Sequence, residues 1–444
     1  MSHARSPPEA DKSAQWEKPF AKVFISEEKG MGLKATSDIP AGTMLINEEV
    51  IAVLGEERLK SVTNPREYNQ FIAAKVKAMG GNEYARQFMS LPNKCKEHYD
   101  GFMNIFGGVM ETCNFPANLD GIPSAVVGLD SAYLNHACFP NVVVSFLTPQ
   151  DIYGERAGQH PDEYWIRAYT CVNVAKGEEL AAAYNHLNFP AATRKARMQG
   201  FYAFDCHCEH CEKADPAVDG FMDVYGKIER TLIQPHAIEN EPAAVLEAAY
   251  DLGIGMIAVG IFDYRYATLW EQCAVLCAWH SDEGRALVFA GRSHATYELL
   301  EGADGRNSKR LWYWRNNIQE LPGFGASKRG KSSEMEAKLL VYNPRRHAEI
   351  LFMLGAKKKE YVRLSDYSGV IGQREDESFG WITREHDNED DDDEKETPQQ
   401  LEAFLEELEN EKKEYDQDRL AKEKEKPSAN KKSKGKGKGK KAKH

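Results

Sequence analysis

The sequence has no run of about eighteen apolar residues, the length that an α-helix needs to cross a bilayer, so we expect no membrane span. Residues Met1 to Pro8 lack the apolar core of a secretory signal. Cysteine is scarce, with nine among 444 residues, and an odd number argues against a disulfide framework. Three of the cysteines stand together at Cys206, Cys208 and Cys211, which favours intracellular thiols with one metal site.

Charge is segregated along the chain, so the net charge of −12 describes no single surface. Acidic residues concentrate in Asp387 to Glu396, and basic residues in Lys431 to Lys443. We predict a disordered N-terminus over residues 1–18 and a charged tail over 376–444. The basic tail suits weak contact with nucleic acid or nuclear import, although solvated disorder alone explains its composition.

Short apolar segments broken by glycine and proline predict a strand-rich domain over residues 19–213. A helical pattern from about Pro65 to Met110 interrupts it, and we interpret residues 50–130 as an insertion. The clearest expected strands are Ala21–Ile25, Ala125–Val127, Val142–Phe146 and Tyr164–Tyr169.

Residues 214–375 show successive amphipathic patterns, which predict a second domain of α-helical hairpins. The expected helices are Val224–Leu232, Ala243–Leu252, Tyr266–Trp279 and Glu283–Leu300. Cys273 and Cys277 fall four residues apart in one of them, and we interpret them as buried core thiols. The fold class is therefore α+β, with a strand-rich domain followed by a helical one.

The cluster Cys206-x-Cys208-x-x-Cys211 supplies three ligands, whereas a tetrahedral structural zinc needs four. His207 and His210 are local candidates, but their adjacency to the cysteines makes the geometry awkward. Cys138 is a distant candidate that would join the cluster to the strand-rich core. Three free thiols in a polar loop are the alternative.

Two glycine- and asparagine-containing motifs say little when taken alone. Gly30-Met31-Gly32 predicts either a tight turn or a backbone against which a ligand can lie. Asn135-His136 by itself would be an ordinary turn. The combination with Cys138, Pro140-Asn141, Gly177-Glu178-Glu179 and Tyr184, in this order, is far more specific.

Together these motifs resemble the SET-domain protein lysine methyltransferases, of the SET-and-MYND-like, fungal type without the MYND finger. The resemblance covers about residues 20 to 213. It rests on Asn-His-x-Cys-x-Pro-Asn at 135–141, Gly-Glu-Glu-Leu-x-x-x-Tyr at 177–184, and the post-SET ending from Tyr202 to Cys211. Ala137 stands where serine is more usual, and residues 50–130 lack the dense Cys/His set of a MYND finger.

The resemblance implies S-adenosyl-L-methionine and zinc as cofactors, and it assigns the site residue by residue. Tyr184 would be the catalytic-site phenol, and Tyr202 would line the substrate channel together with Phe204. The residues implied to contact the cofactor are Met31, Gly32, Asn114, Asn135, His136 and Phe204. The implied zinc ligands are Cys138, Cys206, Cys208 and Cys211, which favours Cys138 over the two histidines.

The implied reaction is methyl transfer from a sulfonium to a lysine amine, an in-line displacement that needs alignment and exclusion of water. The amine must be neutral, and an apolar aromatic channel lowers its pKa. A phenol has an ordinary pKa of about 10, so we assign Tyr184 to positioning rather than to proton abstraction.

We therefore expect an S-adenosylmethionine-dependent protein-lysine N-methyltransferase whose substrate class includes histones. The alternatives are a methyltransferase for non-histone proteins and a non-catalytic SET-fold interaction protein. We further expect a monomer that is nuclear and/or cytoplasmic.

Overall fold

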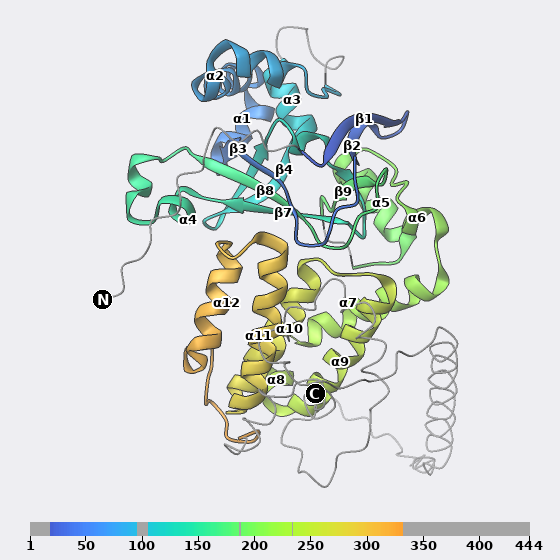
Figure 1. Cartoon of the computed structure of the whole chain (residues 1–444), viewed down its shortest axis with the longest axis vertical. Helices are drawn as coiled ribbons and strands as arrows, with labels where there is room; N and C mark the ends of the chain where they lie inside the picture. Colours follow the sequence, from blue (N-terminus) through green and yellow to red (C-terminus); the bar gives the residue numbers. More distant parts are fainter. Residues whose placement is uncertain (1–17, 96–104, 186–187, 233, 332–444) are drawn as a thin grey trace, which may run out of the picture.

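The structure, a computed structural model, describes residues 18–95, 105–185, 188–232 and 234–331. The acidic run and the basic tail lie outside these residues. A strand-rich domain occupies the middle of the molecule, with helices of an insertion on one side of it and the C-terminal helices on the other (Figure 1). The predicted α+β class is confirmed.

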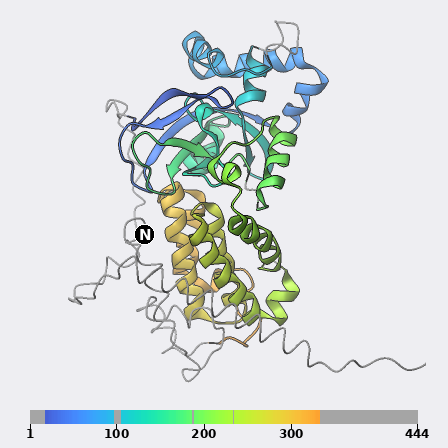
Figure 2. The same cartoon turned by 90° about the vertical axis from the view of Figure 1, so that its right-hand side faces the viewer.

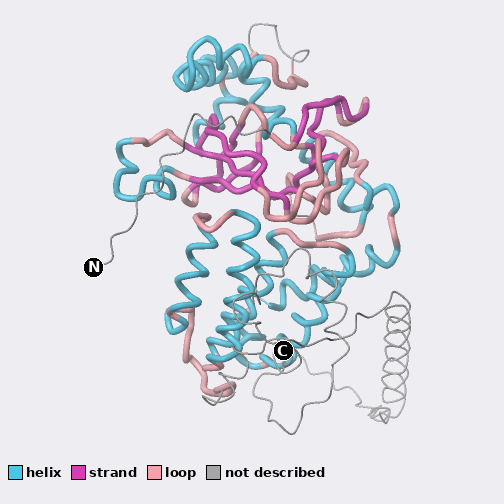
Figure 3. The backbone as a smooth tube through the Cα atoms, viewed as in Figure 1, coloured by secondary structure: helices cyan, strands magenta, loops and turns pink. Residues whose placement is uncertain are grey.

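Nine strands form one sheet of mixed direction, seen in magenta in Figure 3. The order is β1-β2-β9-β7-β8-β3-β5-β4, and β6 pairs with β9 outside this path. The strands are β1 (Phe20–Ser26), β2 (Gly30–Ala35), β3 (Met44–Leu54), β4 (Phe115–Leu119), β5 (Ile122–Val127), β6 (Asn135–His136), β7 (Val142–Leu147), β8 (Tyr164–Thr170) and β9 (Glu179–Ala182).

Strand β3 is the longest strand and holds the sheet together, because it pairs with β8 along its first part and with β5 along its last. Its side chains Leu45, Ile46, Val50 and Ala52 are buried in the same core as Phe20 and Ile166. With 11 residues, β3 is long enough to pair with two neighbours, one along each part of its length. Short helices α4 (Pro149–Tyr153), η1 (Ser131–Tyr133) and η2 (Gly154–Gln159) join the other strands.

The insertion contains α1 (Gly55–Thr63), α2 (Pro65–Met89) and α3 (Phe106–Cys113). Helices begin ten residues before the predicted Pro65, at Gly55. Asn64 caps α2 through its side chain, and Pro65 occupies the first turn, where a missing amide hydrogen costs nothing. Strands β4 and β5 also fall within residues 50–130, so this segment adds an edge to the sheet as well as helices.

Several C-terminal helices are longer than the apolar pattern predicts. The structure also contains a helix, α12, that this pattern does not predict. The C-terminal helices are α5 (Ala191–Tyr202), α6 (Glu209–Lys213), α7 (Pro216–Leu232), α8 (Pro235–Asn240), α9 (Pro242–Val259), α10 (Tyr264–Trp279), α11 (Glu283–Glu301), α12 (Arg306–Asn316) and η3 (Ile318–Glu320). Helices α7 to α11 share one apolar core, which includes Leu246, Trp270 and Phe289. Cys273 and Cys277 are buried in it, as predicted.

Helix α9 is, among the described residues, the one helix long and apolar enough to cross a membrane by length and composition. The sequence shows no unbroken apolar run there because Glu247 and Asp251 interrupt it. Leu246, Leu252 and Met256 on this helix are buried in the helical core. The packing is that of a core helix.

The two domains meet where α11 ends against β7 and β8. Val143 and Tyr169 from these strands share a buried apolar cluster with Leu299 and Leu300 of α11 and with Leu311 of α12. Figure 2, turned by 90°, shows the helices standing end-on beneath the sheet. A buried apolar cluster therefore joins the two domains.

Candidate active site and metal centre

Strand β6 carries the Asn135-His136 pair to the place where Tyr184 lies. It pairs in parallel with β9, so that Asn135 is opposite Ala181 and His136 is opposite Ala182. Tyr184 is the second residue after the end of β9. A contact between parallel strands requires a long connection, here more than forty residues, so local patterning in the sequence could not place it.

Asn135 is the centre of a polar group formed with strands β2 and β9. Its amide nitrogen donates to the carbonyl of Met31 at 3.3 Å and to Oε1 of Glu179 at 3.0 Å. The other Glu179 oxygen accepts from Lys29 Nζ at 2.6 Å. The Asn135 amide hydrogens thus point into the protein, which leaves Oδ1 as an acceptor for a ligand.

Gly32 faces this asparagine with no room for a side chain. A Cβ built at Gly32 would stand 2.6 Å from Asn135 Nδ2 and 2.7 Å from Ile25 Cγ1. The close approach explains a glycine at this position. Met31 beside it is exposed, and Gly30, with φ +71°, turns the chain. The predicted contacts of Met31 and Gly32 with the cofactor stay predictions.

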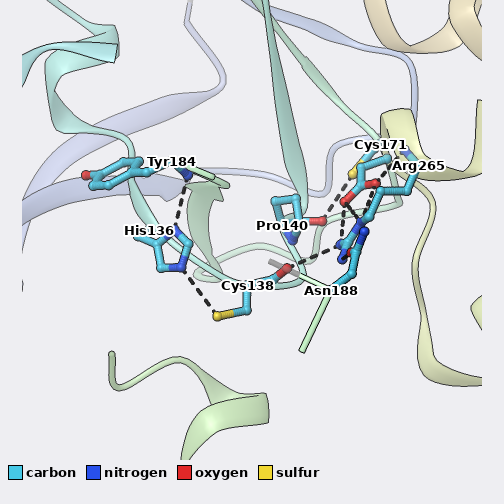
Figure 4. A network of polar contacts seen from close by, with 8 residues as sticks. His136, Cys138, Pro140, Cys171, Tyr184, Asn188 and Arg265 are labelled. Atoms are coloured by element: carbon cyan, nitrogen blue, oxygen red, sulfur yellow. Dashed lines mark hydrogen bonds and ion pairs between the residues drawn. The ribbon is translucent and has the colours of Figure 1, made fainter. Parts of the chain in front are cut away.

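The ring of His136 is buried and contacts both Cys138, one of the predicted metal ligands, and the main chain of Tyr184. Its Nδ1 accepts from the main-chain amide of Tyr184 at 3.1 Å, and its Nε2 lies 3.4 Å from Cys138 Sγ. Since an amide only donates, the neutral ring carries its proton on Nε2, facing the sulfur. Figure 4 shows this chain from Tyr184 through His136 to Cys138. The cofactor contact of His136 stays a prediction.

Tyr184 stands inside a shell of aromatic rings. Phe115 meets it edge-on at 5.5 Å, Tyr202 lies at 5.5 Å and Phe204 at 6.3 Å between ring centroids. Its hydroxyl donates to the Leu134 carbonyl at 2.9 Å. Burial raises the pKa of the Tyr184 phenol well above its ordinary value, so the group stays protonated at neutral pH.

Tyr202 and Phe204 reach this shell because α5 ends between them. Ala203, the residue after the helix, takes a left-handed conformation with φ 55°, which turns the chain. The Tyr202 hydroxyl then donates to the Tyr184 carbonyl at 3.0 Å, and the Phe204 ring lies 5.9 Å from that of His136. The two predicted channel residues therefore both lie beside Tyr184.

The four predicted zinc ligands come together in one buried cluster. The sulfur atoms of Cys138, Cys206, Cys208 and Cys211 all lie within 4.8 Å of one another. Cys138 Sγ is 3.6 Å from Cys211 Sγ and 3.9 Å from Cys206 Sγ. Zinc–sulfur bonds of about 2.3 Å at the tetrahedral angle separate the sulfurs by about 3.8 Å, so the donor set fits zinc.

The electrostatics of the cluster point the same way. Four sulfurs this close can be thiolates together only if a cation neutralises them. His207 instead pairs with Glu212, and the His210 ring lies on Phe139 at 4.1 Å, so neither histidine joins the four sulfurs.

Asn114 caps the C-terminus of α3, since its amide nitrogen donates to the carbonyls of Met110 and Glu111. Its neighbour Phe115 is the one that contacts Tyr184. The predicted cofactor contact of Asn114 stays a prediction.

Sequence reasoning missed Phe115 and Glu179. Phe115 had a usable signal, because it directly follows Asn114, one of the residues implied to contact the cofactor. Glu179 lies in the Gly-Glu-Glu-Leu motif, but nothing in the sequence tells which of its two carboxylates faces Asn135.

Comparison with known proteins agrees with this geometry. A family model described as the SET domain matches residues 30–185. A putative SET domain-containing protein of Acanthamoeba polyphaga mimivirus is 28% identical over 225 residues, covering 44% of this chain and 78% of that protein. The histone-lysine N-methyltransferase set5 of Schizosaccharomyces pombe is 21% identical over 307 residues, covering 67% of this chain and 83% of that protein.

Among solved structures, a SET domain of LSMT bound to lysine and AdoHcy aligns with a TM-score of 0.27 and 13% identity, covering 78% of this chain and 95% of that one. The N-lysine methyltransferase SMYD2-B of Danio rerio is 33% identical over 82 residues, which are 18% of this chain and 15% of that protein. The matched segment 30–185 contains the Gly-x-Gly, Asn-His and Tyr184 motifs that the sheet brings together, and this segment of the chain is thus a SET domain.

Proposed function

We propose that this protein transfers a methyl group from S-adenosylmethionine to the side-chain amine of a lysine in a protein substrate. The observation that carries the proposal is the environment of the Tyr184 hydroxyl, which lies in an aromatic shell and donates its proton to the Leu134 carbonyl. A phenol whose proton is already engaged keeps its oxygen lone pairs to accept an N–H from a neutral amine.

The aromatic shell would act on the incoming lysine before the transfer. Phe115, Tyr202 and Phe204 offer an apolar lining that disfavours an ammonium and lowers the pKa of the amine. Tyr184 would then orient the amine nitrogen toward the methyl group. The raised pKa of its phenol rules it out as a base at neutral pH, so the lysine proton leaves to solvent.

The bound cofactor would supply the methyl group on a positively charged sulfur. Asn135 Oδ1 would accept a hydrogen bond from the ammonium of its amino-acid part, since both Asn135 amide hydrogens are directed at Met31 and Glu179. The absence of a side chain at Gly32 lets Asn135 pack closely against β2, which would hold its Oδ1 in place for the cofactor.

Zinc would have a structural role at the four cysteines. All four ligands are sulfurs, and a site closed by four protein ligands leaves no position for substrate. Metal binding would fix Cys138 to the segment 206–211, and with it the turn that aims Tyr202 and Phe204 at Tyr184.

The substitution Tyr184→Phe tests the proposed role of the phenol. It removes the acceptor oxygen while keeping the ring, and we expect kcat to fall about 10²-fold with the cofactor Kd unchanged. The assay follows transfer from labelled cofactor to histones and to a whole-cell protein extract. The matched control is Tyr153→Phe at the end of α4, which removes a phenol hydroxyl that is bonded to Glu163. Full transfer by Tyr184→Phe would refute the role.

For the substrate class, we propose histones. The fission yeast relative set5 is named a histone-lysine N-methyltransferase, which supports this class. Mass spectrometry of the labelled extract identifies the acceptor protein, and label confined to proteins other than histones would replace this part of the proposal. A protein that binds no cofactor in calorimetry would instead be a non-catalytic interaction protein.

A further inference from the structure

One arginine of the helical domain reaches into the middle of the Asn135–Asn141 motif. Arg265 lies in the first turn of α10, and its side chain is only 4% exposed. Its Nη2 donates to the main-chain carbonyl of Cys138 at 3.2 Å, and its Nη1 donates to the Asn188 side chain at 3.3 Å. Figure 4 shows these bonds on the far side of Cys138 from His136.

The guanidinium is held rigidly in this position. Asp263, the residue that caps α10, accepts from Arg265 Nε at 2.9 Å and from Nη2 at 2.6 Å, and its side chain is 1% exposed. A planar guanidinium with several bonds in fixed directions keeps little freedom. The guanidinium of Arg265 is therefore already oriented to donate to the Cys138 carbonyl and to the Asn188 side chain.

Phe139, next to Cys138, strengthens the same connection. Its ring packs against the apolar core of the helical domain, and Arg265 and Arg194 each lie 5.4 Å from its centroid. On the other side of Tyr184, the amide nitrogen of Asn188 donates to Glu229 of α7 at 3.0 Å. The helical domain thus holds the motif before Tyr184 and the chain after it.

We propose that Arg265 is a positioning residue through which the helical domain holds the Cys138–His136–Tyr184 chain in place. Arg265 bonds to Cys138, the sulfur of Cys138 faces His136 Nε2, and His136 Nδ1 accepts from the Tyr184 amide. Displacing the Cys138 main chain would move a metal ligand and the tyrosine together. The effect on transfer rests on the proposed function, whereas the effects on the metal and on the Tyr184 amide do not.

The test uses the full-length zinc-loaded protein with Asp263→Asn and Arg265→Met combined. Removing both charges avoids leaving Asp263 buried and unpaired, and asparagine still caps the helix. The matched control is Asp282→Asn combined with Arg285→Met, because this ion pair also stands at the start of a helix, α11. Its charged atoms are 2.6 Å apart, and the side chains of Asp282 and Arg285 are 0% and 4% exposed. It lies at the opposite end of α11 from Leu299, which packs on the sheet, roughly 20 Å away at about 1.5 Å per residue.

Three measurements separate positioning from general destabilisation. Relative to the control pair, we expect the Arg265 variant to release zinc to a chelating dye at least tenfold faster. We expect at least tenfold faster hydrogen exchange of the Tyr184 amide and at least a tenfold lower kcat. Zinc release and exchange equal to those of the control would overturn the proposal, whatever the melting temperatures.

Asn188→Ala provides a second test should the double variant fail to fold. It removes the side chain that accepts from Arg265 Nη1 at a half-buried position, and we expect at least threefold faster exchange of the Tyr184 amide. Unchanged exchange would overturn the proposal. If the wild-type protein transfers no methyl group to any protein while these differences are present, the proposed function fails and the positioning role stands.

Discussion

In the strand-rich domain the polar groups of the site come from segments far apart in the chain, whereas the two most deeply buried ion pairs in the described part of the helical domain each lie within one helical turn. Asn135 bonds to Glu179 from 44 residues away, and Cys138 lies beside Cys211 from 73 residues away. Asp263 and Arg265 are two residues apart, and Asp282 and Arg285 three.

This difference predicts how each domain fails. A change at the site in the strand-rich domain removes a contact on which a ligand depends, because the polar groups of the site come from distant segments. The structural effect of a change in the helical domain stays local, so the change lowers the free energy of unfolding and leaves ligand binding intact. Arg265 is a buried exception, since it belongs to the second domain and bonds to the Cys138 carbonyl in the first.

The largest contrast is expected between two buried cysteines. Cys138→Ser removes one of four clustered sulfurs, and zinc content should fall from about one per chain to nearly none. Cys273→Ser, in the helical core, should keep the zinc and lower the free energy of unfolding by about 1–3 kcal/mol, since a hydroxyl is buried among apolar groups. Metal analysis after desalting and denaturant unfolding measure the two effects.

An unchanged zinc content in Cys138→Ser would contradict the four-cysteine site. It would return the fourth position to His207 or His210, the two ligands that spacing alone left open.

Two crowded glycines give the next contrast. Gly32→Ala places a methyl group 2.6 Å from Asn135 Nδ2, and we expect it to weaken cofactor binding at least about tenfold, or about 1.4 kcal/mol. Gly255→Ala in α9 meets the Phe221 ring at 2.1 Å, and it should cost about 1–3 kcal/mol of unfolding free energy.

Calorimetric titration with the cofactor separates these two variants. The cofactor Kd of Gly255→Ala should stay within twofold of the wild-type value. A loss of affinity in Gly255→Ala as large as that in Gly32→Ala would show that overpacking either domain disturbs the site, and the comparison between the domains would fail.

The smallest effect is expected at the polar edge of the domain interface. Arg306 of α12 pairs with Asp151 at 2.7 Å and Asp120 at 3.0 Å in the strand-rich domain, but its side chain is 43% exposed. Solvent screens such pairs, so Arg306→Ala should change the free energy of unfolding by less than about 1 kcal/mol. A larger loss in urea unfolding would mean that ion pairs, rather than the apolar cluster of Val143 and Leu300, hold the domains together.

Parts of the fold could be predicted where the apolar period is strong. The predicted strands at Val142–Phe146 and Tyr164–Tyr169 correspond to β7 and β8, and the predicted Tyr266–Trp279 and Glu283–Leu300 to α10 and α11. Helix α12 has no such period, because Ser308 and Leu311 are its buried residues. The predicted helix Ala243–Leu252 ends short of α9, which continues to Val259. Gly253 and Gly255 are poor helix formers, but they pack closely on Trp270 and Phe221.

For the site, the motifs identified the residue types but not their partners. Tyr184, Tyr202 and Phe204 were expected in one place and lie in one aromatic shell. Phe115 and Glu179 were missed because pairing between distant strands decides which side chain faces the site. Arg265 was missed for a stronger reason, since its role depends on how two domains pack.

The sequence by itself determined the chemistry available to this protein: three closely spaced thiols, a phenol after a short strand, and glycines where side chains do not fit. These are local properties, set by residue type and spacing. Only the tertiary structure decided that Cys138 completes the sulfur cluster, that Glu179 orients Asn135, and that the helical domain bonds to Cys138. Each of these contacts joins residues that are separated by dozens of positions, and chain folding alone brings them within bonding distance.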